Sequence, residues 1–357
     1  MIIILFGLHN HAFLCQRNLL KNNQQNRLVL ISNLEIEPIE KDRETLIQKI
    51  KTKFENLFYK QIANNIQKYI KPNNVVFMGN MIKNEEKINI KDAEINAFQR
   101  FQDLFFEDLN KKKAIFIPGK NELFPDQLKQ NLEENLEEHL EENYEKEMQE
   151  YLTEIFKSNF NDFNIRMTKD DHELIFLNSL FLDEEETNRN LESLNFLKSF
   201  ESQAKARILF SHLPLSKTIG ACLDGNNSTL EEKKTVSKVS SFVVLSSILP
   251  RFIFSGNSEK YCEFRFGKET LEFVVPSLRK TGQYLIFEYL GSENSLGYDY
   301  NILSCGSISF KFFISFWISS IIWFVYVIYS FFTGIHFSEV WKEFQKKKRD
   351  SQKRKEK

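Results

Sequence analysis

Short runs of β-branched and aromatic residues recur along the chain, each bounded by Asn, Gly, Pro or a charged residue, and they predict β-strands. The runs are residues 28–36, 75–79, 114–118, 174–182, 207–211, 251–255, 270–276 and 283–289. Apolar residues recur at helical spacing within residues 40–70, and a second helix is predicted at residues 93–109. Strands that alternate with helices are typical of parallel pairing, whereas the second half of the chain has strands in succession. The pattern predicts the α/β class, as an α/β/β/α sandwich of two mixed sheets.

An acidic near-repeat interrupts this pattern at about residues 124–157. Leu132, Leu136, Leu140 and Tyr144 recur at every fourth position, so a helix here would carry one apolar stripe on an otherwise acidic surface. We expect a solvated insertion helix that lies on the domain. The alternative is a calcium-buffering or partner-binding element.

The uncharged stretch at residues 312–332 has the length and the apolar character of a transmembrane helix. Lysine and arginine crowd the tail at residues 338–357, and the positive-inside rule places such a tail in the cytoplasm and the main domain in the lumen. Lys353 and Lys355 fit a retrieval signal for the vesicle-coat machinery. These features predict a protein of the endoplasmic reticulum or early Golgi membrane.

Two further segments bear on this topology. Asn226 and Asn227 each begin a glycosylation sequon, which is used only on the lumenal side. Residues 1–26 begin with an apolar segment that lacks a basic n-region, so a signal peptide, an anchor remnant and a truncated start all stay open.

Composition and charge narrow the class of protein. The 357 residues are 27% charged and 42% hydrophobic with a formal net charge of -1, which indicates a globular domain, here residues 27–305, and no nucleic-acid partner. The four cysteines are too few and too scattered for a disulfide framework or a zinc module. A single bridge in a lumenal domain stays open.

Five predicted strands end in loops with polar residues at related positions. The loop residues are Asn33, Glu35, Asn80, Lys83, Lys120, Asn121, Glu122, His212, Asn257 and Glu259. Metal sites that hydrolyse phosphate esters are built from carboxylates and imidazoles that converge at strand ends. The loops are therefore placed like those of such a metal site, but most of their side chains are not the carboxylates and imidazoles that it needs.

Together the loops resemble those of the calcineurin-like metallophosphoesterases, whose motifs are Asp-x-His, Gly-Asp-x-x-Asp, Gly-Asn-His-Asp, a lone His and Gly-His-x-His. The narrower resemblance is to the membrane-anchored ethanolamine-phosphate phosphodiesterases that remodel GPI-anchor glycans in the early secretory pathway. It rests on the phrases Ser211-His212-Leu213-Pro214-Leu215 and Tyr261-Cys262-Glu263, together with the predicted span and basic tail. The resemblance implies a metallophosphoesterase-like sandwich and two divalent metals such as manganese.

The residues at the motif positions change what this site is expected to do. Two-metal hydrolysis needs a bridging carboxylate, but the bridging position holds Asn80, a neutral amide. Lys120 puts an ammonium at another ligand position, and Asn121 stands where the resemblance implies the leaving-group histidine. His212 is the retained motif histidine. We therefore expect a degenerate metal site, with no catalytic residue assigned beyond the motif positions Asn121 and His212.

Two interpretations of the remaining side chains stay open. Asn33, Glu35, Asn80 and Glu259 suit a single hard cation such as calcium or magnesium. In the other interpretation these side chains bond to one another and to Lys120 in place of a metal.

The sequence as a whole predicts a membrane-anchored, catalytically inactive protein of this phosphodiesterase type that binds or transports GPI-linked cargo. Lys83 and Lys120 would contact a phosphate of the GPI glycan. One alternative is an active metal-dependent phosphodiesterase with a rearranged site that uses Glu122, Glu263 or Asp299. The second alternative is a structural subunit of a membrane assembly, because a fold alone does not decide function.

Overall fold

The computed structural model describes residues 26–38, 45–83, 90–107, 109–123, 150–160, 162–169, 172–184, 188–200, 206–217, 235–289, 300–306, 315, 317–333, 341–342 and 346. Several predicted features lie outside the described residues: residues 1–25, most of the acidic insertion (124–149), Asn226, Asn227, Asp299, Lys353 and Lys355. The chain divides into two compact units, one of Phe6–Phe310 and one of Met1–Leu5 with Lys311–Lys357.

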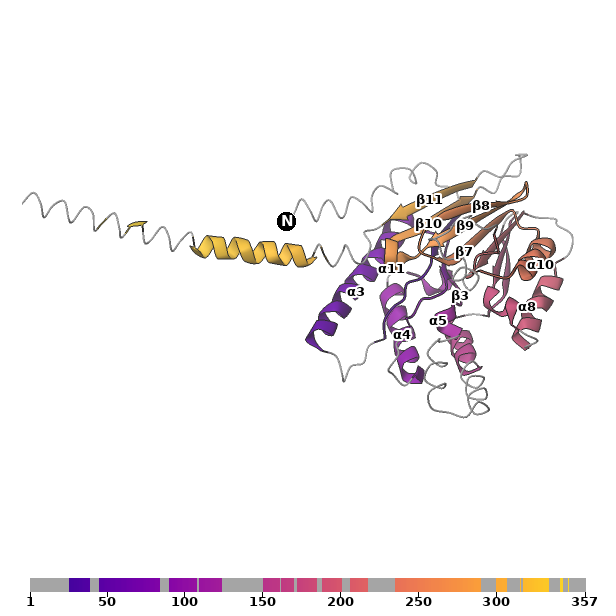
Figure 1. Ribbon diagram of the computed structural model, residues 1–357, viewed down its shortest axis with the longest axis horizontal. Helices are drawn as coiled ribbons and strands as arrows, with labels where there is room; N and C mark the ends of the chain where they lie inside the picture. The colour runs from indigo at the N-terminus through magenta and orange to yellow at the C-terminus, as the bar shows by residue number, and fades with distance from the viewer. Residues whose placement is uncertain are drawn as a thin grey trace, which may run out of the picture. The chain divides into compact units, whose positions relative to one another are not determined.

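A five-stranded mixed sheet forms one half of the larger unit, in the order β11-β10-β1-β2-β3, and its neighbouring strands β10 and β11 are labelled in Figure 1. Its strands are β1 (Asn26–Ile31), β2 (Asn74–Met78), β3 (Ala114–Ile117), β10 (Gln283–Tyr289) and β11 (Tyr300–Gly306). β1, β2 and β3 are parallel, with Val29 opposite Val75. β10 and β11 run antiparallel to their neighbours. The three parallel strands therefore end at the same edge of the sheet.

A six-stranded mixed sheet forms the other half, in the order β4-β5-β6-β7-β9-β8. Its strands are β4 (Ile165–Lys169), β5 (His172–Leu177), β6 (Ala206–Ser211), β7 (Phe252–Ser258), β8 (Cys262–Phe266) and β9 (Thr270–Pro276). β5, β6, β7 and β9 are parallel, and the two edge strands β4 and β8 are antiparallel to their neighbours.

The core lies between the two sheets, where alternate residues of each strand face inward. Leu28 and Leu30 of β1, Phe210 of β6, Phe254 of β7 and Phe287 of β10 are fully buried there. The ring centroids of Phe254 and Phe287 are 4.8 Å apart, across the space between the sheets. Burying one such side chain stabilises the fold by about 2 kcal/mol, so this core supplies a large share of the stability.

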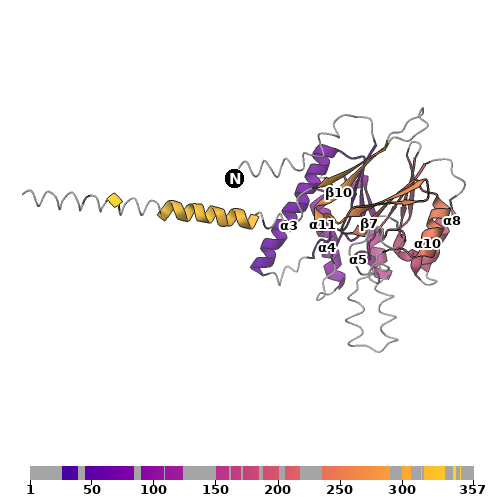
Figure 2. The ribbon, with the colours of Figure 1, turned by 45° about the horizontal axis from the view of Figure 1, so that its top comes forward.

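Helices cover the outer faces of both sheets (Figure 2). They are α3 (Leu46–Asn65), α4 (Ile90–Phe105), α8 (Asn188–Lys198) and α10 (Lys238–Ile248). Two short helices follow strand ends, α5 (Lys120–Leu123) after β3 and α11 (Leu278–Thr281) after β9, and there are 3-10 helices at Lys111–Lys113 and Ser179–Asp183 and a π-helical turn at Ile66–Ile70. Phe101 of α4 contacts Phe77 of β2 on the first sheet. Leu197 of α8 and Val244 of α10 belong to the apolar cluster on the second sheet.

The predicted sandwich of two mixed sheets is confirmed, and it fits the metallophosphoesterase fold that the resemblance implies. The predicted strand at 174–182 is wrong beyond Leu177. The Asn178 side chain accepts a hydrogen bond from the Leu180 N–H (3.1 Å) and thereby starts a 3-10 helix. β4, β8 and β11 were not predicted. At the end of the acidic insertion, residues 150–159 are helical and Phe156 is buried.

The smaller unit contains a helix at residues 317–333, on which Ile321, Trp323 and Tyr326 are exposed. Within the described part of the chain, no helix has both the length and the apolar character needed to cross a membrane. The transmembrane helix predicted at 312–332 is thus not found there, and residues 312–314 and 316 of that range lie outside the described residues.

Two cysteines lie in edge strands of the two sheets. Cys262 of β8 and Cys305 of β11 are each disulfide-bonded, and no cysteine among the described residues is a free thiol. The chain therefore has at least one disulfide bridge, which the sequence had left open.

Candidate functional site

The five polar loops meet at the carboxyl ends of the parallel strands. The Asn33 N–H donates to the Gly79 carbonyl (3.1 Å) and the Glu35 N–H to the Asn80 carbonyl (2.9 Å), which joins the loops after β1 and β2. The Gly256 N–H donates to the His212 carbonyl (2.9 Å), which joins the loop after β6 to the end of β7.

Two glycines allow the loops to approach this closely. A Cβ at Gly79 would lie 2.3 Å from Nδ1 of His212 and 2.6 Å from Cα of Gly119, so the loops after β2, β3 and β6 share one small space. A Cβ at Gly119 would lie 2.1 Å from the backbone nitrogen of Asn80. Any side chain at either position would push the loops apart.

The backbone keeps an unusual conformation at four of the motif positions. Asn33, Glu35, Asn80 and Asn257 all have φ between 49° and 56°. Asparagine tolerates this left-handed region, whereas glutamate enters it at a cost of about 1–2 kcal/mol. Such conformations persist where the surrounding structure enforces them. The loops therefore hold the side chains at these four positions in fixed directions.

Glu122 ties the loops after β2 and β3 together from inside. Its carboxylate is fully buried and accepts hydrogen bonds from the backbone N–H groups of Asn80 (2.9 Å), Ile82 (3.0 Å) and Gly119 (2.7 Å). Burial raises the pKa of Glu122 to about 7, although the backbone donors oppose that shift. Both carboxylate oxygens are used in these bonds, so Glu122 is a bracing residue and is not placed to bind a metal.

The bridging position is occupied by an amide that is already bonded. Oδ1 of Asn80 accepts a hydrogen bond from the Asn121 N–H (3.1 Å). The Asn121 side chain in turn donates to the Ile82 carbonyl (2.9 Å). The two residues therefore link their loops to each other through these bonds.

His212 keeps the protonation state of a metal ligand. It is fully buried, and Nδ1 lies 2.8 Å from the Met78 carbonyl, which can only accept, so the proton of the neutral ring is on Nδ1. Burial lowers the pKa of His212 to about 4, against the opposing effect of the bond to Met78. Nε2 is buried with no hydrogen-bond partner among the described residues. The imidazole is thus neutral and has one lone pair directed into the protein.

Basic residues of α11 bond to the metal-motif loops. The Lys280 ammonium pairs with the Glu259 carboxylate of the last motif. The Arg279 N–H donates to the Asn33 carbonyl (3.3 Å), and the Arg279 guanidinium donates to the Glu35 carbonyl. Ser277 caps α11 and donates its hydroxyl to the Asn33 carbonyl (3.2 Å). Two protein cations therefore sit against the loops that the resemblance assigns to metals.

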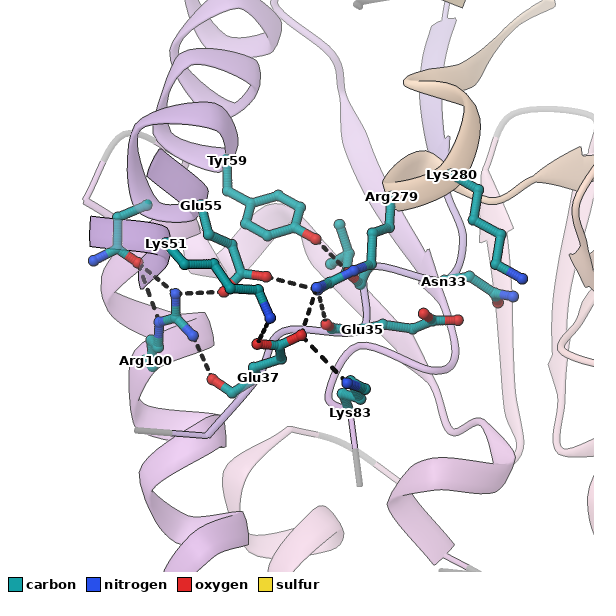
Figure 3. A network of polar contacts seen from close by, with 12 residues as sticks. Asn33, Glu35, Glu37, Lys51, Glu55, Tyr59, Lys83, Arg100, Arg279 and Lys280 are labelled. Carbon is teal, nitrogen blue, oxygen red and sulfur yellow. Dashed lines mark hydrogen bonds and ion pairs between the residues drawn. The ribbon is translucent and has the colours of Figure 1, made fainter. Parts of the chain in front are cut away.

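An ion-pair network fixes Arg279 in place (Figure 3). Its guanidinium bonds to Glu55 (2.6 Å) and Glu37 (2.7 Å), and Glu55 is shared with Arg100 (2.6 Å). Burial raises the pKa of Glu37, but the hydrogen bond from Lys51 and the charges of Arg279 and Lys83 outweigh this, so that pKa is lowered. Each buried charge of the network has a partner, as buried charges require.

The lysines and the other acids named from the sequence have different surroundings. Lys83 lies 3.3 Å from Glu37 in the network of Figure 3, and Lys120 is exposed at the start of α5. The Glu35 carboxylate points toward Asn33 and Lys280 (Figure 3). Glu263 lies on the edge strand β8 and is exposed.

The donor set does not fit a two-metal centre. No group of three or more His, Cys, Asp or Glu side chains in the described part of the chain is placed to hold a metal ion. Asn80 supplies no bridging charge, and Glu259 is paired with Lys280. The side chains of the alternative calcium or magnesium site also have partners within the protein. Oδ1 of Asn33 accepts a hydrogen bond from the Ser32 hydroxyl (3.0 Å), and Oδ1 of Asn80 accepts one from the Asn121 N–H.

Sequence reasoning missed Arg279, Lys280, Glu37 and Glu55. Glu55 carried a usable signal, since it lies three and four residues before the buried Phe58 and Tyr59 and so falls on the apolar face of α3. A charged residue on such a face is expected to have a buried partner of opposite charge.

No protein-family model matches the chain, and no curated protein matches it. Solved structures with a similar chain path include a dimetal phosphatase from Danio rerio, with 10% identity over 80% of this chain and 100% of that chain and a TM-score of 0.44. A putative 5'-nucleotidase from Staphylococcus aureus has 11% identity over 80% of this chain and 55% of its own, with a TM-score of 0.48. GAP50, the anchor in the inner membrane complex of Plasmodium, has 11% identity over 79% and 85%, with a TM-score of 0.44.

Proposed function

We propose that this chain is a non-catalytic protein of the calcineurin-like metallophosphoesterase type. One observation carries the proposal: two of the side chains at the motif positions, Asn80 and Glu259, are already bonded within the protein. The amide of Asn80 is bonded to Asn121, and Glu259 is paired with Lys280. Two-metal hydrolysis needs free anionic ligands that share the ions, and these loops do not offer them.

The role we propose is binding or transport of GPI-linked cargo at the membrane of the endoplasmic reticulum or early Golgi. The Tyr261-Cys262-Glu263 phrase supports the narrower resemblance. The disulfide-bonded Cys262 and Cys305 support a lumenal domain, because disulfides persist in oxidising compartments. Anchoring by residues 312–332 and retrieval through the basic tail complete this proposal.

The exposed Lys120 supports recognition of a glycan phosphate. It lies in the loop after β3, beside the bonded pair Asn80 and Asn121, where an ammonium attracts an anion and repels a divalent cation. Lys83 is a weaker phosphate contact than the sequence suggested, because its ammonium already lies 3.3 Å from Glu37.

A phosphodiesterase assay tests the loss of catalysis. The purified full-length chain is incubated with manganese and an aryl phosphodiester, and its metal content is measured by elemental analysis. We expect no bound manganese and no turnover above the rate of the His212→Ala variant. Turnover that His212→Ala abolishes would contradict the proposal. Binding of a phosphoethanolamine glycan, weakened by Lys120→Glu, tests the proposed role separately.

One observation favours the active phosphodiesterase as a second candidate. His212 is neutral and its Nε2 lone pair has no hydrogen-bond partner among the described residues, which is the state that a metal ligand needs. This candidate requires Lys280 to release Glu259. Manganese titrations of the wild type and of Lys280→Ala distinguish the two functions, since the second candidate predicts manganese-dependent turnover in the wild type itself and a lower manganese requirement in the variant.

A further inference from the structure

The N-terminal half of α3 has no fully buried residue. The buried residues of α3 begin at Glu55, and none of the residues from Leu46 to Phe54 is buried. Leu46 and Ile47 are 74% and 79% exposed. Short helical segments are marginal in water without packing, so an unpacked half-helix with large apolar side chains is expected to have a partner.

Two parallel rows of side chains run along the face of α3 that is turned away from the core. The apolar row is Leu46, Ile50 and Leu57, and the basic row is Lys49, Lys53 and Lys60. In each row the second residue follows the first by four positions and the third follows the second by seven. Each lysine comes three positions after a residue of the apolar row, so the two rows lie side by side on the helix. The apolar row is exposed along its length, with Ile50 at 47% and Leu57 at 54%.

The charged side chains at the surface of α3 are all positive. The helix has four lysines and one glutamate, Glu55, and that glutamate is buried and bonded to Arg100 and Arg279. Lys60 pairs with Glu107, while Lys49 and Lys53 are exposed beside the apolar row. A helix with an apolar row flanked by lysines is suited to lie in the interface of an anionic membrane.

We propose that this face of α3 docks on an anionic lipid surface. Leu46, Ile50 and Leu57 enter the boundary between headgroups and acyl chains, and the flanking lysines extend to the lipid phosphates. Charge selects this partner over a second copy of the chain, because two copies of the basic row would repel each other. The proposal rests neither on the catalytic state of the strand-end loops nor on the predicted span at 312–332. It also stands apart from the proposed lumenal placement, because the anionic surface invoked here is that of a cytoplasmic leaflet.

A local label tests the docking when preformed vesicles are added to the full-length chain. A polarity-sensitive fluorophore is placed at Asn64→Cys, which is exposed and lies seven residues after Leu57 on the same face. We expect blue-shifted, brighter emission in vesicles of phosphatidylcholine with phosphatidylserine, and little change in phosphatidylcholine alone. The chain without the added cysteine, labelled in the same way, gives the background from native thiols.

Two paired substitutions separate the contributions of the two rows. Lys49→Gln with Lys53→Gln is expected to lower the docking equilibrium on anionic vesicles about thirtyfold, since each basic residue near the surface contributes about 1 kcal/mol, a factor of about five. Ile50→Ser with Leu57→Ser is expected to remove the shift. The matched control is Val239→Ser with Phe242→Ser on α10, where both side chains are more than 70% exposed but have no such basic row beside them. This control should leave the shift intact.

Several results would overturn the docking proposal. One is an equal shift on neutral and anionic vesicles, and another is an equal shift from a label at the exposed Asn195 of α8. A shift that survives Ile50→Ser with Leu57→Ser would exclude the apolar row. An emission shift that appears without vesicles and grows with protein concentration would show that a second copy of the chain covers this face. A shift that is lost on deletion of residues 1–25 would show that this segment of the same chain covers it.

Discussion

Two fully buried side chains at the strand ends, Glu122 and His212, have pKa values shifted in opposite directions. The Glu122 carboxyl keeps its proton in the folded protein up to a pH of about 7, whereas its ordinary pKa is 4.5. Its contribution to stability therefore falls as the pH rises between these values. The His212 pKa falls from 6.5 to about 4, so its contribution falls as the pH drops through that range. The two dependences oppose each other between about pH 4.5 and 6.5.

Substituting each residue alone should uncover the pH dependence of the other. Glu122→Gln is expected to make the free energy of unfolding fall more steeply than in the wild type as the pH drops from 6.5 to 4.5. His212→Gln is expected to make it fall as the pH rises from 4.5 to 7. Each slope is at most about 1.4 kcal/mol per pH unit. Urea unfolding across this pH range measures both, and parallel curves for wild type and variants would contradict the assignment.

The short helix α11 carries none of the motif residues, yet its side chains bond to the loops of the candidate site. Arg279 bonds to the backbone of the loop after β1 and to two buried acids, and Lys280 pairs with the last motif. The side chain of Arg279 is 13% exposed, whereas that of Lys280 is 49% exposed. Adjacent residues of one helix are therefore expected to differ widely in their effect on stability.

Arg279→Ala is expected to destabilise the fold by about 3–5 kcal/mol, because it leaves Glu55 and Glu37 buried with fewer partners. Arg279→Lys should recover only part of this loss, since an ammonium cannot reproduce the planar fork of bonds. Lys280→Ala is the matched control, and removing its exposed ion pair should cost about 0–1 kcal/mol. The midpoint of urea unfolding gives all three values. Equal losses for Arg279→Ala and Lys280→Ala would show that the network adds nothing.

At the scale of the whole molecule, the positions of the main strands and the two-sheet sandwich could be predicted from the sequence. Buried strands such as β2 and β3 contain continuous apolar runs, which are easily recognised. The edge strand β4 has three exposed residues in succession and no alternation, so it gave no signal. The error at residues 174–182 came from Asn178, whose capping bond is a local choice that an apolar run conceals.

The candidate site was predictable only in its loops. Residue types at the strand ends indicated which motif positions had changed, because those positions lie in short, ordered segments. The partners of the changed residues come from distant parts of the chain: Arg279 is 224 residues from Glu55 and 244 from Glu35. Such pairs depend on the tertiary fold, and a single sequence gives no measure of them.

Thermal unfolding of the full-length chain tests whether the native state binds metal. A ligand that binds only the folded state raises the melting temperature by mass action. We expect the same melting temperature with EDTA, manganese, calcium or magnesium, because Asn80 and Glu259 are already bonded within the protein. An increase with manganese that His212→Ala removes would indicate a remaining ion site.

The ion pair between Lys280 and Glu259 also bears on how evolution could alter this site. Under the proposed loss of catalysis, an acid at position 80 would add a charge without freeing Glu259, and Lys120 would stay in its loop. Both lysines and several loop residues would have to change together before hydrolysis returned. A single substitution is therefore not expected to restore catalysis.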